Sequence, residues 1–229
     1  AYGEAYAASS AGVICVHPDR RGRAPDGACL LLSEQPYRAY ALAAAALFPD
    51  PDTRNGISPD AHVDAMARLG PGCAVEVGVV IEAGVETGEN CFIGANAVIR
   101  AGVKLGKFCR IEAGVTLSHA LVGDGVRIGP GSQIGQNGFG FVPDPENYIS
   151  VPQLGRVQIG DGAEIGANCT IDRGASGDTV IGHGCRLDNM VHIAHNVRLG
   201  RGCILAGQVG IAGHLTIGKG SQIAAKTGV

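Results

Sequence analysis

Tryptophan is absent from this sequence of 229 residues, and aromatic residues make up only 4% of it. No stretch approaches eighteen consecutive apolar residues, so we expect no membrane-spanning helix. Charged residues are 17% and the formal net charge is −3 without a clustered basic face, so nothing predicts nucleic-acid binding. Few aromatics beside 37 glycines predict many tight turns and thin, repetitive packing.

The abundant glycine does not follow a three-residue period, which excludes a collagen helix. The first residues lack the basic segment of a secretory signal. No CxxC motif occurs among the eight cysteines, so metal or disulfide roles are disfavoured and a reducing cytoplasmic location is expected.

A six-residue period of aliphatic residues runs through most of the chain, and neither a helix nor an ordinary strand predicts it. From Ile57 to Leu117 every sixth residue is aliphatic except Thr87. The phase slips once, resumes from Val122 and, after two interruptions, continues to Val229. This period predicts a mainly β protein, a parallel β-helix of hexapeptide repeats with about 18 residues in each turn.

A second inward position in each hexad carries a small or β-branched residue. Six cysteines fall there: Cys73, Cys91, Cys109, Cys169, Cys185 and Cys203. We interpret them as compact core residues. A serine in their place is expected to bury a hydroxyl without a partner, at a cost of about 1–3 kcal/mol.

Residues 1–52 do not show the period and are predicted to form a small α/β module. Residues 12–16 and 28–32 are typical of short strands, and residues 36–48, alanine-rich with Pro36 at the start, predict a helix. Residues 53–229 form the predicted β-helix domain.

Two segments interrupt the repeat. The long insertion, residues 136–156, carries three of the aromatic residues, and a loop on a rigid solenoid often carries function. A surface excursion that covers an apolar edge is the alternative. The short insertion, residues 173–179, is expected to turn a corner.

Three segments resemble the UDP-3-O-(3-hydroxyacyl)glucosamine N-acyltransferases of lipid A biosynthesis. They are QIGQNGFGF from Gln133, VPQLGRVQIGDGAEIGANCTIDRGASGDTVIG from Val151, and LDNMVHIAHNVRLG from Leu187. The helix PYRAYALAAAALF resembles that family's uridine-binding module. The resemblance implies that the coil is left-handed.

The resemblance also implies the reaction, the partners and the assembly. A (R)-3-hydroxyacyl group would pass from acyl carrier protein to the 2-amine of UDP-3-O-(3-hydroxyacyl)glucosamine, without a cofactor. The enzyme would be a cytoplasmic homotrimer with active sites between neighbouring coils. Val229 ends inside the repeat, so we expect the family's last coils and its C-terminal helical extension, which helps to dock acyl carrier protein, to be missing.

The amine must lose a proton before it attacks a thioester, and a histidine with an ordinary pKa near 6.5 suits that role. Among seven histidines, His195 matches the family's catalytic base. Asp188, Asn189 and His192 lie in the same motif and are expected to contact the sugar. Asn196 is expected to satisfy a turn.

Other candidate residues lie outside that motif. Gly138 and Gly140 would let the loop backbone approach the ligand closely. Tyr37 and Tyr40, three apart on the predicted helix, would stack on uracil, or else pack the core of the module. Asp172 and its neighbour Arg173 are expected either to form a structural pair or to contact the substrate.

Three other functional classes stay open. One is a trimeric zinc enzyme of the carbonic anhydrase type, in which three histidines shared across the trimer interface bind zinc; His192, His195 and His214 lie near one another along the coil. Another is an acyltransferase that acts on a different nucleotide sugar. A non-catalytic scaffold would explain the repeat but would leave the AHN motif of residues 194–196 and the module of residues 1–52 without a role. We predict no metal site.

Overall fold

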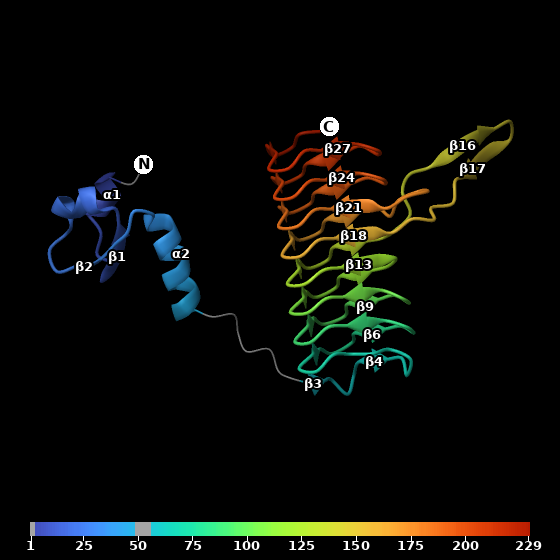
Figure 1. Cartoon of the computed structure of the whole chain (residues 1–229), viewed down its shortest axis with the longest axis horizontal. Helices are drawn as coiled ribbons and strands as arrows, with labels where there is room; N and C mark the ends of the chain where they lie inside the picture. The colour runs from blue at the N-terminus through green and yellow to red at the C-terminus, as the bar shows by residue number, and fades with distance from the viewer. Residues whose placement is uncertain (1–2, 49–55) are drawn as a thin grey trace. The chain divides into compact units, whose positions relative to one another are not determined.

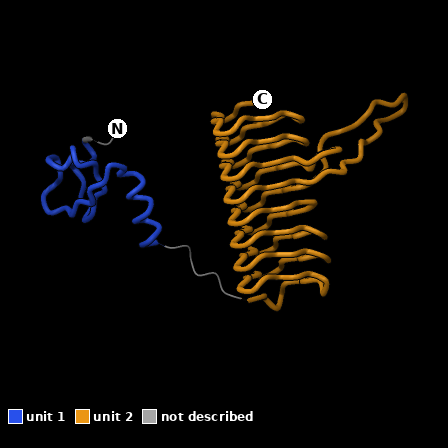
Figure 2. Tube along the Cα trace, in the orientation of Figure 1, with its two compact units in different colours: residues 1–52 blue, residues 53–229 orange. Residues whose placement is uncertain are grey.

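The computed structural model describes residues 3–48 and 56–229. The contacts within the chain divide it into two compact units, which Figure 2 distinguishes by colour. Unit 1 is Ala1–Asp52 and unit 2 is Thr53–Val229. Neither described α-helix is long and apolar enough to cross a membrane.

Unit 1 is a small α/β module. Its elements are α1 (Gly3–Ala7), β1 (Val13–Val16), the 3-10 helix η1 (Pro18–Arg23), β2 (Cys29–Leu32) and α2 (Pro36–Leu47). β1 and β2 pair in parallel, with Val13 opposite Cys29. The two expected strands and the expected helix are confirmed. Neither α1 nor η1 was predicted; Pro18 suits the first position of η1 because its φ is already fixed near the helical value.

Unit 2 is a parallel β-helix of three sheets wound around one core (Figure 1), as the six-residue period predicts. Face 1 holds β3 (Gly56–Ile57), β5 (Ala74–Val75), β8 (Phe92–Ile93), β11 (Arg110–Ile111), β14 (Arg127–Ile128), β19 (Glu164–Ile165), β22 (Arg186–Leu187), β25 (Ile204–Leu205) and β28 (Gln222–Ile223). Face 2 holds β4 (His62–Val63), β6 (Val80–Ile81), β9 (Val98–Ile99), β12 (Thr116–Leu117), β15 (Gln133–Ile134), β20 (Thr170–Ile171), β23 (His192–Ile193) and β26 (Gly210–Ile211). Face 3 holds β7 (Glu86–Thr87), β10 (Lys104–Leu105), β13 (Ala120–Val122), β18 (Val157–Ile159), β21 (Thr179–Ile181), β24 (Arg198–Leu199) and β27 (Thr216–Ile217).

The core lies inside the triangular coil. The last residue of nearly every strand points inward, and Ile81, Ile111 and Ile193 are completely buried. The small residue that precedes each strand is also buried, as at Val79 and Val191. Each fully buried aliphatic side chain contributes about 1.5–3 kcal/mol, so the stacked rungs stabilise one another.

The six cysteines of unit 2 are buried and free, which confirms their place in the core. Their thiols are not without partners, however. Cys185 donates to the carbonyl oxygen of Gly200 at 3.2 Å, in the next rung of the coil. Ser132, completely buried at an equivalent position, donates to the carbonyl oxygen of Gly166 at 2.8 Å. The expectation that a serine would lack a partner there is therefore wrong, because the next rung supplies an acceptor.

The irregular segments leave the coil between the end of face 2 and the start of face 3, an edge that we call corner 2/3. The long insertion leaves after β15 and returns at β18. It contains an antiparallel hairpin of β16 (Phe141–Asp144) and β17 (Asn147–Ser150), which projects from the coil (Figure 1). The hairpin was not predicted. The short insertion joins β20 to β21 at the same corner.

Candidate active site

Corner 2/3 gathers the chemically distinctive segments of unit 2. His119, the two insertions, His195 and His214 all lie between a face 2 strand and the next face 3 strand. In the sequence they are spread over almost a hundred residues. The repeat stacks them along one edge.

His195 is held between two glycines. A Cβ atom on Gly138, in the long insertion, would lie 2.8 Å from the Cβ of His195, and one on Gly213 would lie 3.0 Å from its Cε1. Larger residues at either position would displace the ring. His214, one rung above, meets the ring edge-on with centroids 4.9 Å apart. The imidazole is half-buried, which leaves part of it open to a substrate.

Asn196 fixes the tautomer of His195. Its Oδ1 accepts a hydrogen bond from the backbone N–H of Ala175 at 2.9 Å and lies 3.2 Å from Nδ1 of His195. Its Nδ2 donates to the carbonyl oxygen of Gly177 at 3.2 Å, so the hydrogen bonds distinguish the oxygen of the Asn196 amide from its nitrogen. Because Oδ1 can only accept, Nδ1 of His195 carries the proton in the neutral ring and Nε2 is left with a lone pair.

Asn196 also occupies a turn, as expected, with φ at 61°. Asparagine tolerates this left-handed conformation better than most residues. Its backbone N–H donates to Oγ1 of Thr179 at 2.8 Å. The same residue therefore pins the short insertion and orients the candidate base, a second role that sequence reasoning missed.

The short insertion is in turn attached to the long one. The N–H of Gly155 donates to the carbonyl oxygen of Gly174 at 2.8 Å, and Nε of Arg173 donates to the carbonyl oxygen of Gly155 at 2.7 Å. Arg156 pairs with Asp178, with Nη2 and Oδ2 3.1 Å apart. These bonds fix the return end of the long insertion beside His195.

Asp172 is a buried carboxylate at this corner, with 6% of its surface exposed. Its Oδ1 accepts a hydrogen bond from Nε2 of Gln136 at 2.8 Å. Burial raises the pKa of Asp172, while the bond from Gln136 and the charges of His192 and His195 oppose the rise. Asp172 is thus bonded to Gln136, the first residue of the long insertion, whereas its neighbour Arg173 donates to Gly155 near the end of that insertion.

His192 lies on face 2, opposite Thr170 in the neighbouring strand. Its Nδ1 is 2.7 Å from Oγ1 of Thr170, and the side chain is exposed. Its ring therefore points out of the coil, where a ligand or another chain can reach it.

Asp188 and Asn189 lie at the opposite edge of face 2, at corner 1/2 between β22 and β23. Both are exposed, and Oδ1 of Asn189 accepts a hydrogen bond from the N–H of Ala167 at 2.8 Å. Within one chain, face 2 separates them from His195. The structure does not bring these three predicted site residues together in a single coil.

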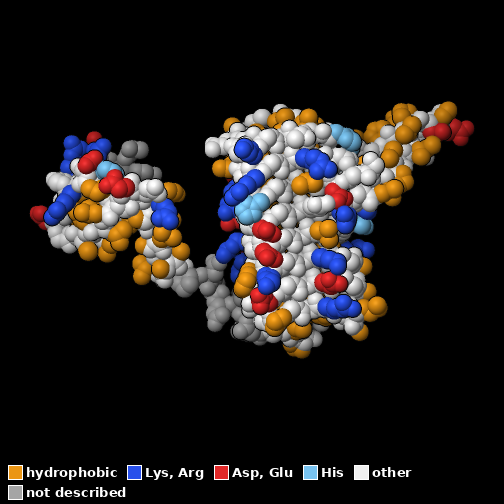
Figure 3. Space-filling view, viewed as in Figure 1, with side chains coloured by type: hydrophobic (Ala, Val, Ile, Leu, Met, Phe, Trp, Pro, Cys, Tyr) orange, Lys and Arg blue, Asp and Glu red, His pale blue; other side chains and the backbone are white. Residues whose placement is uncertain are grey.

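At Gly138 and Gly140 the backbone of the long insertion lies close to other side chains of the same chain. Gly138 lies against His195, as above. A Cβ atom on Gly140 would lie 3.0 Å from Nε2 of Gln153. Phe139, Phe141 and Tyr148 pack edge to face with centroids 5.0 Å apart, and Figure 3 shows apolar side chains along the projecting hairpin.

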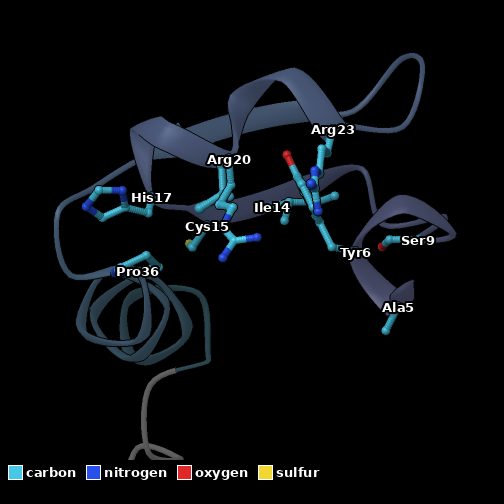
Figure 4. Close-up of a pocket in the computed structure, with 10 residues that line it drawn as sticks. Ala5, Tyr6, Ser9, Ile14, Cys15, His17, Arg20, Arg23 and Pro36 are labelled. Atoms are coloured by element: carbon cyan, nitrogen blue, oxygen red, sulfur yellow. The ribbon is translucent and has the colours of Figure 1, made fainter. Parts of the chain in front are cut away.

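Tyr37 and Tyr40 are exposed on α2, at 85% and 60% of their surface. Their rings stack with centroids 6.4 Å apart. Packing in the module core, the alternative considered for them, is therefore wrong. Unit 1 also has a hollow of about 510 Å³, lined by residues that include Tyr6, Arg20 and Arg23 (Figure 4), and neither tyrosine of α2 lines it.

Within the described parts of the chain, no group of three histidine, cysteine or carboxylate side chains is placed to hold a metal ion. His195 and His214 are close, but His192 points away on face 2. Within one coil, His192 therefore does not join His195 and His214. The zinc alternative shares its ligands between coils, so this arrangement of a single coil does not decide it.

Known families and proteins resemble this chain in sequence. The family described as hexapeptide repeat of succinyl-transferase matches residues 84–119 and 156–194, and the family described as bacterial transferase hexapeptide matches residues 178–213. The UDP-3-O-acylglucosamine N-acyltransferase of Granulibacter bethesdensis is 50% identical over 198 residues, or 86% of this chain. That of Parvibaculum lavamentivorans is 52% identical over 205 residues.

The chain belongs to the UDP-3-O-acylglucosamine N-acyltransferase family. It spans 58% of the length of each of these two relatives. Among solved structures, a UDP-N-acetylglucosamine acyltransferase from Arabidopsis superimposes with a TM-score of 0.65 at 24% identity. The superposition covers 76% of this chain and 60% of the Arabidopsis chain. At 24% identity, the likeness shows the fold alone.

Proposed function

We propose that the protein is an N-acyltransferase of lipid A biosynthesis. It moves a (R)-3-hydroxyacyl group from acyl carrier protein to the 2-amine of UDP-3-O-(3-hydroxyacyl)glucosamine. The observation that carries the proposal is the geometry of His195. Its Nδ1 proton is committed to Asn196, and the ring lies half-exposed at the corner where both insertions leave the coil. The relatives that share this stretch are named as N-acyltransferases of an acylated UDP-glucosamine.

In this mechanism His195 is the general base. Nε2 accepts a proton from the amine while the amine nitrogen forms a bond to the thioester carbonyl carbon. The carbon–sulfur bond then breaks, and the departing thiolate takes the proton back from the imidazolium. The six cysteines of unit 2 face the core, so the coil offers no thiol for a covalent acyl-enzyme. Direct transfer between two bound substrates fits this arrangement.

We propose that face 2 is the surface on which three copies associate. Its strands carry no Asp, Glu, Lys or Arg at their outward positions within the described chain, whereas faces 1 and 3 carry ladders of charge. On face 3, for example, Lys104 pairs with Glu86 at 3.1 Å. Figure 3 shows charged side chains aligned in columns along the coil. Depletion of charge is typical of the centre of an interface.

A three-fold assembly through face 2 would complete the site. Neighbouring coils would then meet along their edges, so that corner 2/3 of one copy lies beside corner 1/2 of the next. His195 of one copy would face Asp188 and Asn189 of its neighbour. This explains why sequence-predicted site residues from one motif lie at opposite edges of a single coil.

We propose that unit 1 binds the uridine part of the substrate through Tyr37 and Tyr40. Exposed aromatic rings have faces on which a base can stack. Their exposure on α2 leaves these faces open.

An acyl-transfer assay tests this function. The purified protein is mixed with 3-hydroxyacyl carrier protein and either UDP-3-O-acylglucosamine or UDP-N-acetylglucosamine. We expect N-acylation of the first acceptor and none of the second, which has no free amine. Transfer to neither acceptor, or to the hydroxyl of the second, would contradict the proposal. A zinc-dependent activity would support the carbonic anhydrase alternative instead.

A further inference from the structure

A buried carboxylate lies one rung below the segment that carries the candidate base. Asp172 follows β20, and its backbone N–H donates to the carbonyl oxygen of Ile193 at 2.9 Å. This pairing places Asp172 one rung below residues 193–195. Its charge interacts with His192 and His195 of the rung above. Among the described side chains, Gln136 is the one that donates a hydrogen bond to the Asp172 carboxylate.

Ionised Asp172 costs stability at neutral pH. Burial raises its pKa above the value in the unfolded chain, so the folded protein binds its proton more tightly than the unfolded chain does. Folding therefore becomes less favourable as pH rises from the ordinary pKa of an aspartate to the raised pKa of Asp172. Above the raised pKa, the full loss of stability is present. A residue that costs stability and lies under a reactive group is a candidate for function.

Asp178, six residues later in the same stretch of chain, behaves in the opposite way. Burial would raise its pKa, but hydrogen bonds from Gln158 and Arg156 together lower it. Its contribution to stability is therefore present above a pH of about 4 and lost as pH falls through the lowered pKa. The two aspartates can therefore be compared directly. Ionised Asp172 destabilises the fold and interacts with histidines, whereas ionised Asp178 stabilises the fold and pairs with Arg156.

The titratable and charged groups around His195 are few. His214 lies against its ring from the rung above, His192 precedes it on β23, and Asp172 lies below. Arg173 directs its Nε to the carbonyl oxygen of Gly155. The long insertion contributes the backbone of Gly138 to the contact, with no charge of its own. Asp172 is thus the anionic group on this side of the imidazole.

We propose that Asp172 is a positioning residue whose negative charge stabilises the imidazolium that forms when His195 takes the proton of the attacking amine. This inference rests on the proposed function and extends it to a residue that never touches the substrate. The bond to Gln136 keeps the carboxylate in place and ties the start of the long insertion to it. A carboxylate that stabilises a catalytic imidazolium is a general device of acid–base catalysis.

Asp172→Asn is the test because an amide can still accept the bond from Gln136 while the charge is lost. The first measurement is an NMR titration of the histidine ring protons in the whole chain. We expect the His195 midpoint to move to lower pH by half a unit or more, since an opposite charge nearby favours the protonated form. Asp178→Asn is the control, and it should leave that midpoint unchanged. An unmoved His195 midpoint, or a shift confined to His192, would overturn the proposal.

Stability and kinetics supply the remaining readouts. At neutral pH, Asp172→Asn should melt at the same or a higher temperature than the parent, whereas Asp178→Asn should melt lower. A purely structural Asp172 would give a lower melting temperature and an unmoved midpoint. In the acylation assay we expect kcat to fall about tenfold with KM for the UDP-sugar unchanged. If the protein transfers no acyl group at all, the proposed function fails, while the titration still decides the role of Asp172.

Discussion

At the scale of single residues, the coil reuses one backbone acceptor at successive rungs. Cys109 donates to the carbonyl oxygen of Gly123 at 3.1 Å, and Cys185 and Ser132 make the equivalent bond. The inward position therefore accepts a small apolar residue, a thiol or a hydroxyl. A buried polar group is costly only when it lacks a partner, and the stacked backbone provides one.

This leads to a revised expectation for Cys185→Ser. The hydroxyl can donate to the carbonyl oxygen of Gly200, so the loss in the free energy of unfolding should be about 1 kcal/mol or less. Urea denaturation of the variant and the parent measures it. A loss of 3 kcal/mol would show that the serine finds no partner.

The same burial makes the coil cysteines unreactive. Burial raises the pKa of the Cys169 and Cys185 thiols, and the thiolate is the reactive form. Cys29 in unit 1 is exposed and serves as an internal control. Under native conditions a mild alkylating reagent should label Cys29 and leave Cys169 and Cys185 unlabelled.

At the scale of elements, each described coil strand is only two or three residues long. Such strands have no independent stability, and their position is set by the rungs above and below. By contrast, the hairpin of β16 and β17 and the helix α2 carry exposed aromatic rings. We therefore propose that the rigid coil supplies the frame and that these irregular elements supply surfaces for recognition.

For α2 we expect Tyr37→Ala and Tyr40→Ala each to weaken UDP-sugar binding by about 1–3 kcal/mol, by analogy with the stacking of bases on aromatic side chains. Both side chains are exposed, so the fold of unit 1 should be unaffected. Leu42→Ala, which removes another exposed apolar side chain from the same helix, is the control. Calorimetry that finds the parent affinity in both tyrosine variants would remove these residues from the uridine site.

The elements differ in how far the sequence predicts them. The coil strands are predictable because the six-residue period repeats at every rung, and α2 because its composition favours a helix locally. Asp144 and Pro145 favour the turn of the β16–β17 hairpin, but Pro143 inside its first strand argues against a strand there, so the hairpin escaped prediction. His195 was found through its resemblance to a family motif. The contact of Asp172 with Gln136 joins residues 36 apart, and no local pattern indicates such a pair.

At the scale of the whole molecule, we propose that one coil holds only half of the site. His195 lies at one edge of face 2, and Asp188 and Asn189 lie at the other. The uncharged outward positions of face 2 favour association through this face. A shared site requires that the copies stay together at working concentrations.

We therefore expect light scattering at micromolar concentration to report the mass of three chains of 23.2 kDa each. Val98→Lys, which places a charge at the outward position of β9 on face 2, should shift the population towards monomers. Val180→Lys at the equivalent position of face 3 is the matched control and should leave the trimer intact. A stable monomer of the parent chain would remove the shared site from the account.

The measurement that bears most directly on the central claim is the acyl-transfer rate of His195→Ala across pH. General-base loss typically costs about 10²–10⁴-fold in rate, so kcat should fall at least a hundredfold. The trimer and UDP-sugar binding should persist, and the rise in rate through one ionisation should vanish. His183→Ala, at an exposed histidine between faces 3 and 1, should retain the parent profile. Near-normal turnover by His195→Ala would contradict the mechanism and make His192 the next base to examine.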